Sequence, residues 1–234
     1  MKRVRTLWAI VVAGAALAVA APAGGANECD GLMVCVPVAG PWVVVPASTA
    51  TQRQRVEFQL TCPRGHVVGG LDARLSVRTI DVGFIGTLGS PVNPGITTSR
   101  SAVFLGTYVG RSAAAPTFRP FIGCIPSAGG GSRIPTAVSQ LRPGTPVTRR
   151  VNSVRVRPGV ATVTQRCRSG ERLVGGSHAF GFSTRTPPSA SLVDSVSGSQ
   201  QFRGESVVVR VQGDAELAGV RAVVQVHALC ARVA

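Results

Sequence analysis

The cysteines constrain the fold of this chain more than any other feature. Their number is even, and no Cys-x-x-Cys pair is present, so disulfides explain them better than a zinc or redox site does. Six cysteines admit fifteen pairings, so further information is needed to choose among them. The six are Cys29, Cys35, Cys62, Cys124, Cys167 and Cys230.

A repeated pattern around four of these cysteines makes the choice. The stretch "TCPRGHVVGG" begins at Thr61 and "RCRSGERLVGG" begins at Arg166. Each is followed by another lone cysteine, and closing a loop of about sixty residues stabilises a unit by roughly 4 kcal/mol on the chain-entropy model. The repeat predicts three bridges: Cys62–Cys124, Cys167–Cys230 and, from the remaining pair, Cys29–Cys35.

Short runs in which apolar and polar residues alternate predict β-strands. "RVEFQLTC", from Arg55 to Cys62, and "GVRAVVQVHALC", from Gly219 to Cys230, each place their cysteine on an apolar face. We expect both cysteines to point inward and both strands to be half-buried. The polar side chains expected to meet solvent in the second strand are Arg221, Gln225 and His227.

Glycines follow the first cysteine of each repeat. Gly65 and Gly170 are expected in turns that need a positive φ. The Gly69-Gly70 and Gly175-Gly176 pairs suit a β-bulge or a close approach of backbone.

Helix signals are nearly absent, so the chain is expected to be all-β. We predict two tandem β-sandwich units of a jelly-roll-like kind, each stapled by a disulfide, after an N-terminal signal helix. The expected first unit covers residues 24–126, a Gly-, Pro- and Ser-rich linker covers 127–146, and the second unit covers 147–234. The segment around Trp42 should complete the first unit, and the segment from Arg149 should open the second. Two sheets of one larger sandwich also fit the chain length, but two similar units packed side by side are favoured.

The start of the chain has the layout of a secretory signal peptide. A basic beginning at residues 2–5 precedes an apolar run over residues 7–21, and small residues suited to cleavage follow. The signal is expected to cover residues 1–23, with the cut after Ala20 or after Ala23. An uncleaved anchor is the alternative, because the apolar run approaches the lower length for spanning a bilayer. No span is expected in the mature chain, which we place outside the cell or on its surface.

The Cys-x-x-Gly turn that leads into Gly-Gly and is closed by a lone cysteine after Val-rich strands resembles a module of exported bacterial proteins of actinobacterial type, whose function is unknown. The resemblance covers roughly two-thirds of the mature chain and rests on a short, glycine-dominated motif. It implies an exported β-rich domain. It implies no catalytic residues.

The chain is strongly basic, with a net charge of +15, and Lys2 is its one lysine. Without the three basic residues of the signal, 22 basic residues stand against 10 acidic ones, which leaves +12. Such a charge favours anionic partners such as wall polymers or polysaccharides. The alternative is that abundant Arg, Ala, Gly, Val and Pro reflect a GC-rich genome.

The stretch "TRRVNSVRVRP", which begins at Thr148, is the strongest candidate for binding. In an extended strand Arg149, Arg155 and Arg157 share one face, where they could grip phosphates or carboxylates along a polymer. The alternative is that these charges protect an edge strand from pairing. No aromatic residues are interleaved with them, so specific nucleic-acid binding is not expected, and Trp42 is expected in the core.

No sequence motif for catalysis is present, and the chain is not expected to be an enzyme. A triad of His178 with Ser177 or Ser191 and Asp194 is conceivable, but no nucleophile motif supports it. No cofactor and no metal are expected, because oxidised cysteines cannot bind zinc and the acidic residues form no ligand cluster.

Three functions follow, in order of preference. The first is a secreted, noncatalytic β-protein with a structural or binding role at the cell surface or outside the cell. The second is an arginine-mediated binding module for anionic wall polymers or polysaccharides. The third is a secreted hydrolase. The oligomeric state is not predicted.

Overall fold

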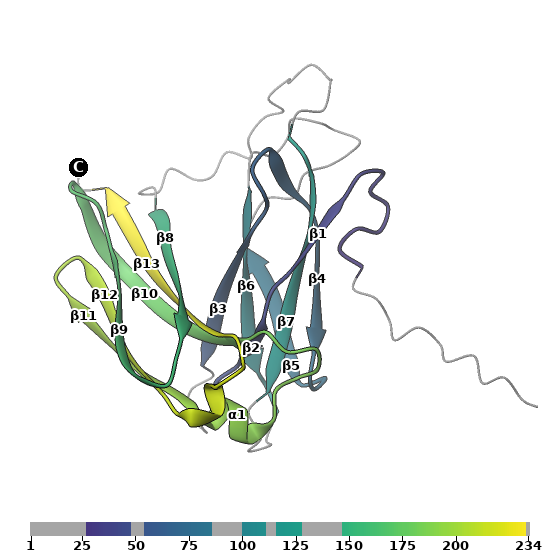
Figure 1. Cartoon of the computed structure of the whole chain (residues 1–234). Helices are drawn as coiled ribbons and strands as arrows, with labels where there is room; N and C mark the ends of the chain where they lie inside the picture. Colours follow the sequence, from purple (N-terminus) through teal and green to yellow (C-terminus); the bar gives the residue numbers. More distant parts are fainter. Residues whose placement is uncertain (1–26, 48–53, 86–99, 111–115, 128–146, 233–234) are drawn as a thin grey trace, which may run out of the picture.

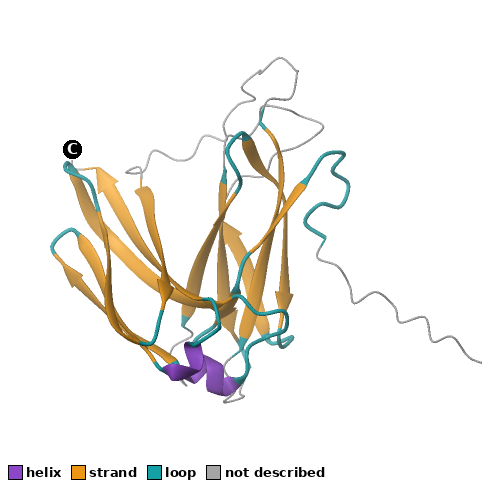
Figure 2. Ribbon diagram, in the orientation of Figure 1, coloured by secondary structure: helices purple, strands orange, loops and turns teal. Residues whose placement is uncertain are grey.

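The computed structural model describes residues 27–47, 54–85, 100–110, 116–127 and 147–232. The expected signal segment and residues 128–146 of the expected linker lie outside these ranges. The described residues are mostly antiparallel strands, with the short helix α1 (Ala190–Asp194) and the 3-10 turn η1 (Ala215–Leu217) in the second half (Figures 1 and 2). The all-β prediction is confirmed.

Two halves of the chain contribute the strands, residues 27–127 and residues 147–232. The strands of the first half are β1 (Val36–Ala39), β2 (Trp42–Val44), β3 (Arg55–Thr61), β4 (His66–Leu75), β5 (Ile80–Ile85), β6 (Ser101–Tyr108) and β7 (Thr117–Pro126). The strands of the second half are β8 (Val147–Val156), β9 (Gly159–Arg166), β10 (Glu171–Phe182), β11 (Val196–Arg203), β12 (Ser206–Gly213) and β13 (Ala222–Arg232).

The strands form three antiparallel sheets. Sheet A has the order β1-β7-β2-β10-β13-β8, and β4 also pairs with β7. Because β4 occupies one edge of β7 along most of its length, β1 and β2 lie end to end along the other edge. Sheet B has the order β3-β6-β5, and sheet C has the order β11-β12-β9.

The two halves have the same strand topology. The pairs β4 with β7, β3 with β6, and β5 with β6 recur as β10 with β13, β9 with β12, and β11 with β12. The pair β2 with β7 recurs as β8 with β13. The segment around Trp42 therefore completes the first half, and the strand that contains Arg149 opens the second, as the sequence predicts.

The three predicted disulfides are all present, as Cys29–Cys35, Cys62–Cys124 and Cys167–Cys230. The two long-range bridges join buried cysteines at equivalent places in the two halves. Each links the end of a sheet B or sheet C strand to the last strand of its half in sheet A, and so clamps two layers together.

The glycine predictions are also confirmed. Gly65 and Gly170 have φ angles of 77° and 78°. The register of β4 shifts between Val68 and Gly70, and the register of β10 shifts between Leu173 and Gly175. Each half therefore has a β-bulge or irregularity at the start of its Gly-Gly pair. A Cβ on Gly70 would lie 1.9 Å from the carbonyl oxygen of Glu28, so a side chain at this position would collide with backbone.

Sheet A runs through both halves without interruption. In β2, Val43 pairs with Phe118 of β7 on one side and with Gly181 of β10 on the other. The halves therefore share backbone hydrogen bonds, and the expected boundary between two units does not divide this sheet. The two predicted β-sandwich units are therefore joined through one continuous sheet.

Sheet B packs on one face of sheet A and contacts strands from both halves of that sheet. One core, which contains Phe58, Phe104 and Phe118, fills the space between sheet B and the first-half part of sheet A. Ala179 of β10 belongs to this same core, so the second-half part of sheet A also contacts sheet B. Sheet C covers the opposite face of that second-half part, around Val224 (Figure 1).

Both faces of β3 are consequently covered. Val56 and Phe58 face the first-half core, while Glu57 and Gln59, on the other face, contact strands of the second half. The prediction of a half-buried strand is wrong here, because the alternation shows two faces but not what packs on the polar one.

The same contact overturns a prediction for β13. Gln225 and His227 were expected to meet solvent, yet they are 4% and 0% exposed. Strand β3 of the first half covers the face of β13 on which both side chains lie. Arg221, just before β13, is exposed as predicted.

Candidate functional site

The predicted arginine group on β8 is divided by the fold. Among the described strands, β8 pairs with β13 alone and is an edge strand, as the alternative interpretation requires. Arg149 points into the contact between the halves, where its Nη1 donates to Glu57 Oε2 at 2.5 Å. Arg155 and Arg157 are exposed. Since six residues of strand span about 20 Å, Arg149 and Arg155 do not act as one grip on a small anion.

Arg149 belongs to a buried polar network that joins β8, β13, β10 and β3. Its Nη1 also lies 2.9 Å from Nδ1 of His227. A guanidinium can only donate, so Nδ1 accepts and His227 carries its proton on Nε2. That Nε2–H donates to Oε1 of Gln225 at 2.8 Å. The imidazole is therefore fixed as the neutral Nε2–H tautomer.

The side-chain amide of Gln225 uses all of its hydrogen-bonding capacity. Oε1 also accepts from the backbone N–H of Gln59 at 2.5 Å, and Nε2 donates to the Gln59 carbonyl at 3.1 Å and to Ser153 Oγ at 3.0 Å. The amide thus occupies the free backbone groups of β3 as a neighbouring strand would. This pairing fixes the position of β3 against β13 across a sequence separation of 166 residues.

Glu57 is the acid of the network and is almost fully buried. Besides Arg149 it accepts a hydrogen bond from Ser177 Oγ at 3.2 Å, and Arg55 Nη2 lies 3.5 Å from its Oε1. Burial by itself raises the pKa of Glu57, but hydrogen bonds from Arg149 and Ser177 and the charge of Arg149 outweigh it. The pKa of Glu57 therefore lies below its ordinary value, and the carboxylate is ionised.

His227 is kept neutral by its surroundings. Burial is the main cause, and the charge of Arg149 adds to it, while the charge of Glu57 opposes both. Together they lower the pKa of His227 to about 4.

The network combines an acid, a histidine and a serine, but its geometry is that of a structural joint. Ser177 donates to Glu57, and both nitrogens of His227 are occupied by Arg149 and Gln225. A serine nucleophile needs a base within hydrogen-bond reach, and His227 does not supply one here.

The candidate triad around His178 is not assembled among the described residues. His178 Nδ1 lies 3.0 Å from Gln200 Oε1, and its ring makes an edge contact with Phe180. Its neighbour Ser177 points to the opposite face of β10, toward Glu57. Ser191 Oγ lies 3.1 Å from Ser189 Oγ, near the start of α1.

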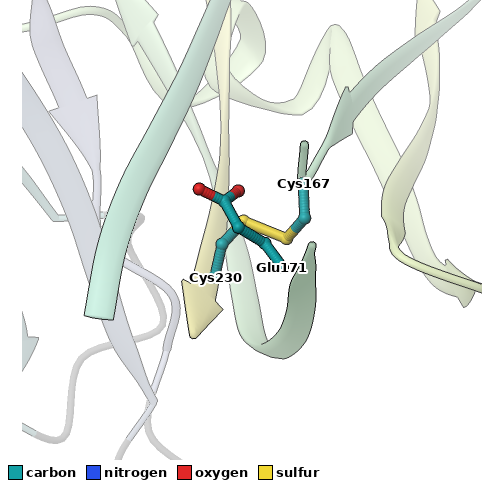
Figure 3. Close-up of side chains that lie close together, drawn as sticks. All are labelled: Cys167, Glu171 and Cys230. Carbon is teal, nitrogen blue, oxygen red and sulfur yellow. A yellow bond between two sulfur atoms is a disulfide. The ribbon is translucent and has the colours of Figure 1, made fainter. Parts of the chain in front are cut away.

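One group of potential metal ligands does come together, at Cys167, Glu171 and Cys230. Their ligand atoms lie within 4.8 Å of one another (Figure 3). The two sulfurs form a disulfide, however, and Glu171 is held by the guanidinium of Arg150 and the backbone N–H of Arg168. These hydrogen bonds, with that of Arg150 the largest cause, lower the pKa of Glu171 to about 2. The group is an ion pair beside a disulfide, and its sulfurs are not available to a metal.

Sequence reasoning missed the buried network. Alternation puts Glu57 and Gln59 on the polar face of a strand that is expected to be half-buried, and Ser177 is predicted only as a candidate triad member. Their contacts instead join residues far apart in the chain. The one available signal is the alternation of Glu57 and Gln59 with apolar residues, and this pattern is the same whether the polar face meets solvent or a second layer.

No helix among the described residues is long and apolar enough to cross a membrane. Neither protein-family models, nor curated proteins, nor solved structures match the chain.

Proposed function

We propose that the protein is an exported, noncatalytic β-protein that binds a partner at the cell surface or outside the cell. The observation that carries this proposal is the set of three disulfides, two of which close loops of 62 and 63 residues. Such bridges form and persist in oxidising compartments. The histidines and serines with defined partners are, in addition, engaged in contacts that hold the fold.

The location is tested by fractionation of the cells that make the protein. We expect the chain in the medium or in the surface fraction, with a mature N-terminus near Ala20 or Ala23 and no free thiols on peptide mapping without reduction. Recovery of a reduced, full-length chain from the cytoplasm would contradict the proposal.

Binding of anionic polymers is the more specific form of this function. Exposed Arg155 on the edge strand β8 and exposed Arg157 just after it support this function, whereas Arg149 is already paired with Glu57. The test is retention on immobilised wall polymer or heparin as the salt concentration rises, since charge attraction is screened by salt. Arg155→Gln with Arg157→Gln should elute at lower salt than the parent protein. An unchanged elution would remove these two residues from the binding surface.

A further inference from the structure

The outer face of sheet C is a large polar surface that the rest of the described chain leaves uncovered. Successive side chains of a strand point to opposite faces, and Val163, Val207 and Val209 point into the second-half core. The alternate positions of β9, β12 and β11 therefore face outward. Three of them are arginines, Arg166, Arg203 and Arg210, and all three are exposed.

The charge of this face has one sign. The outward positions of β9, β11 and β12 include no aspartate or glutamate. Glu205, in the turn after Arg203, accepts a hydrogen bond from the backbone N–H of Leu173 and so directs its carboxylate toward β10. The three guanidiniums are not neutralised by neighbours on the face.

The register fixes how the three arginines are spaced. Ser206 pairs with both Arg166 and Arg203, so these two lie on either side of β12, about 10 Å apart at two strand spacings. Arg210 lies four residues along β12 from Ser206, which is about 13 Å in an extended strand. A linear anion of several repeating units is needed to contact all three.

Two of the arginines are oriented by their neighbours. Arg203 donates to Gln201 Oε1 from Nε and Nη2 at 3.3 and 2.9 Å, and Arg166 Nε donates to Ser206 Oγ at 3.1 Å. Arg210 makes no hydrogen bond or ion pair with another described residue. Holding an arginine in place lowers the entropy lost when it binds a ligand.

Hydroxyl and amide groups fill the space between the arginines. They are exposed side chains that both donate and accept hydrogen bonds. The residues are Thr162, Thr164, Ser197, Ser199, Gln201 and Gln212.

The equivalent face in the other half shows what such a surface can do. The outward face of β3 in sheet B carries Glu57 and Gln59, and it is covered by β13, β10 and β8. Counted back from Cys167 in the second half and from Cys62 in the first, Thr162 and Thr164 of β9 stand where β3 has Glu57 and Gln59. In the first half this face packs against the second half of the same chain, whereas in the second half the equivalent face is exposed and positively charged.

We infer that the outer face of sheet C is a binding site for an anionic polysaccharide. This inference rests on the proposed binding function and adds the place of the site and the class of ligand. The arginines pair with the carboxylates or sulfates of the polymer, and the fork of a guanidinium fits a carboxylate with two hydrogen bonds. The serines, threonines and glutamines exchange hydrogen bonds with the sugar hydroxyls.

Other anionic macromolecules fit this face less well. Binding of single-stranded nucleic acid relies on aromatic rings on which bases stack, and no outward position of sheet C is aromatic. Binding to a membrane surface relies on apolar or aromatic side chains that enter the lipid, and of the exposed outward positions Val160 alone is apolar.

The experiment measures binding of the oxidised mature protein to polygalacturonate, dextran sulfate and neutral dextran by isothermal titration at low and high salt. We expect binding to polygalacturonate or dextran sulfate that weakens as salt rises, and none to dextran. The first polymer tests carboxylates and the second tests sulfates.

The decisive variant is Arg166→Gln, Arg203→Gln and Arg210→Gln together. Three exposed ion pairs that contribute about 0.2–1 kcal/mol each are removed, so affinity should fall roughly 3- to 150-fold. The matched control replaces three exposed arginines away from sheet C, Arg64, Arg78 and Arg221, with glutamine and so has the same net charge. It should bind within about twofold of the parent protein. Because Arg210 has no hydrogen-bond or ion-pair partner among the described residues, Arg210→Gln alone provides a variant that removes no such contact of the described fold.

Three outcomes would overturn the inference. Equal losses in the sheet C variant and the control would mean that net charge alone drives binding. Loss of binding only in Arg155→Gln with Arg157→Gln would place the site on β8 and leave the proposed function standing. Equal or tighter binding to poly(dT) or to phosphatidylglycerol vesicles would assign the face to another class of ligand.

Discussion

Strands β3 and β9 occupy the same place in the two halves and have opposite surroundings. Each pairs with one strand of a three-stranded sheet and precedes the first cysteine of a long-range disulfide. Strand β3 is covered on both faces, whereas most side chains of β9 are exposed. A shared topology therefore does not fix the environment of equivalent residues. The second half covers the polar face of β3, whereas the equivalent face of β9 is exposed.

Polar side chains on these strands match the two environments. Glu57 and Gln59 each find specific partners in the second half, Arg149 and Gln225. Burial of an ion pair is costly unless its remaining hydrogen bonds are also satisfied, and this network satisfies them. Thr162 and Thr164 of β9 need no partner because water is available to them.

The largest expected effect is loss of a long-range disulfide. Replacement of both cysteines by serine, in Cys62–Cys124 or in Cys167–Cys230, should lower the free energy of unfolding by about 4 kcal/mol, since the loops have nearly equal lengths. Chemical denaturation of both variants measures this. Because the loop-closure entropy is nearly the same for both bridges, a difference between the two decreases in the free energy of unfolding reports how strongly each half is held by packing. Unchanged stability in both variants would contradict the clamp.

Breaking the ion pair between the halves comes next. Glu57→Gln leaves Arg149 buried beside a neutral group and should cost about 3 kcal/mol. The double variant Glu57→Gln with Arg149→Met should lose less than the sum of the single variants Glu57→Gln and Arg149→Met, because no unpaired charge remains. A double-mutant cycle from urea unfolding gives the coupling. A coupling near zero would show that the pair does not join the halves.

Acid should loosen the same contact. The pKa of His227 is about 4 in the fold and near 6.5 when unfolded, so the unfolded chain binds a proton between these values and the folded chain does not. Stability is fully present above about pH 6.5 and falls by up to about 3 kcal/mol as the pH drops toward 4. The lowered pKa of Glu57 adds a further loss as the pH falls below its unfolded value of about 4.5.

Unfolding midpoints between pH 4 and pH 7.5 test the acid effect. The variant His227→Gln keeps polar groups at this position but cannot titrate, so its stability should change much less over the upper part of the range. The same pH dependence in parent and variant would exclude His227 as the cause.

Loss of the amide that pairs with β3 should have a smaller effect. Gln225→Leu leaves the backbone N–H and carbonyl of Gln59 without their partner, at a cost of about 1–3 kcal/mol. Hydrogen exchange of the Gln59 amide should accelerate in parallel. Exchange as slow as in the parent protein would mean that another group satisfies this amide.

The smallest effect is expected at the equivalent positions of β9. Thr162→Ser and Thr164→Ser should each change stability by no more than about 0.5 kcal/mol, since both side chains are exposed. Losses as large as those at Glu57 and Gln225 would show that this face is covered as well, and the contrast between the halves would disappear.

Much of the fold could be predicted from the sequence, but less of the site. The inward cysteines, the positive φ of Gly65 and Gly170, and the strand around Trp42 follow from local periodicity and from the repeat. The arginine group on β8 was predicted as one face, and the structure separates Arg149 from it. The separation depends on Glu57, which lies 92 residues away in sequence and carries no local sign of its partner.

The sequence by itself determined the strands, the pairing of the cysteines and the two-half organisation. These features follow from the short-range alternation of apolar and polar residues and from a cysteine–glycine pattern that occurs twice. Tertiary structure alone decided which polar faces are buried. Alternation distinguishes the two faces of a strand, but only the continuation of sheet A through β2 brings the second half over β3 and leaves sheet C open to solvent.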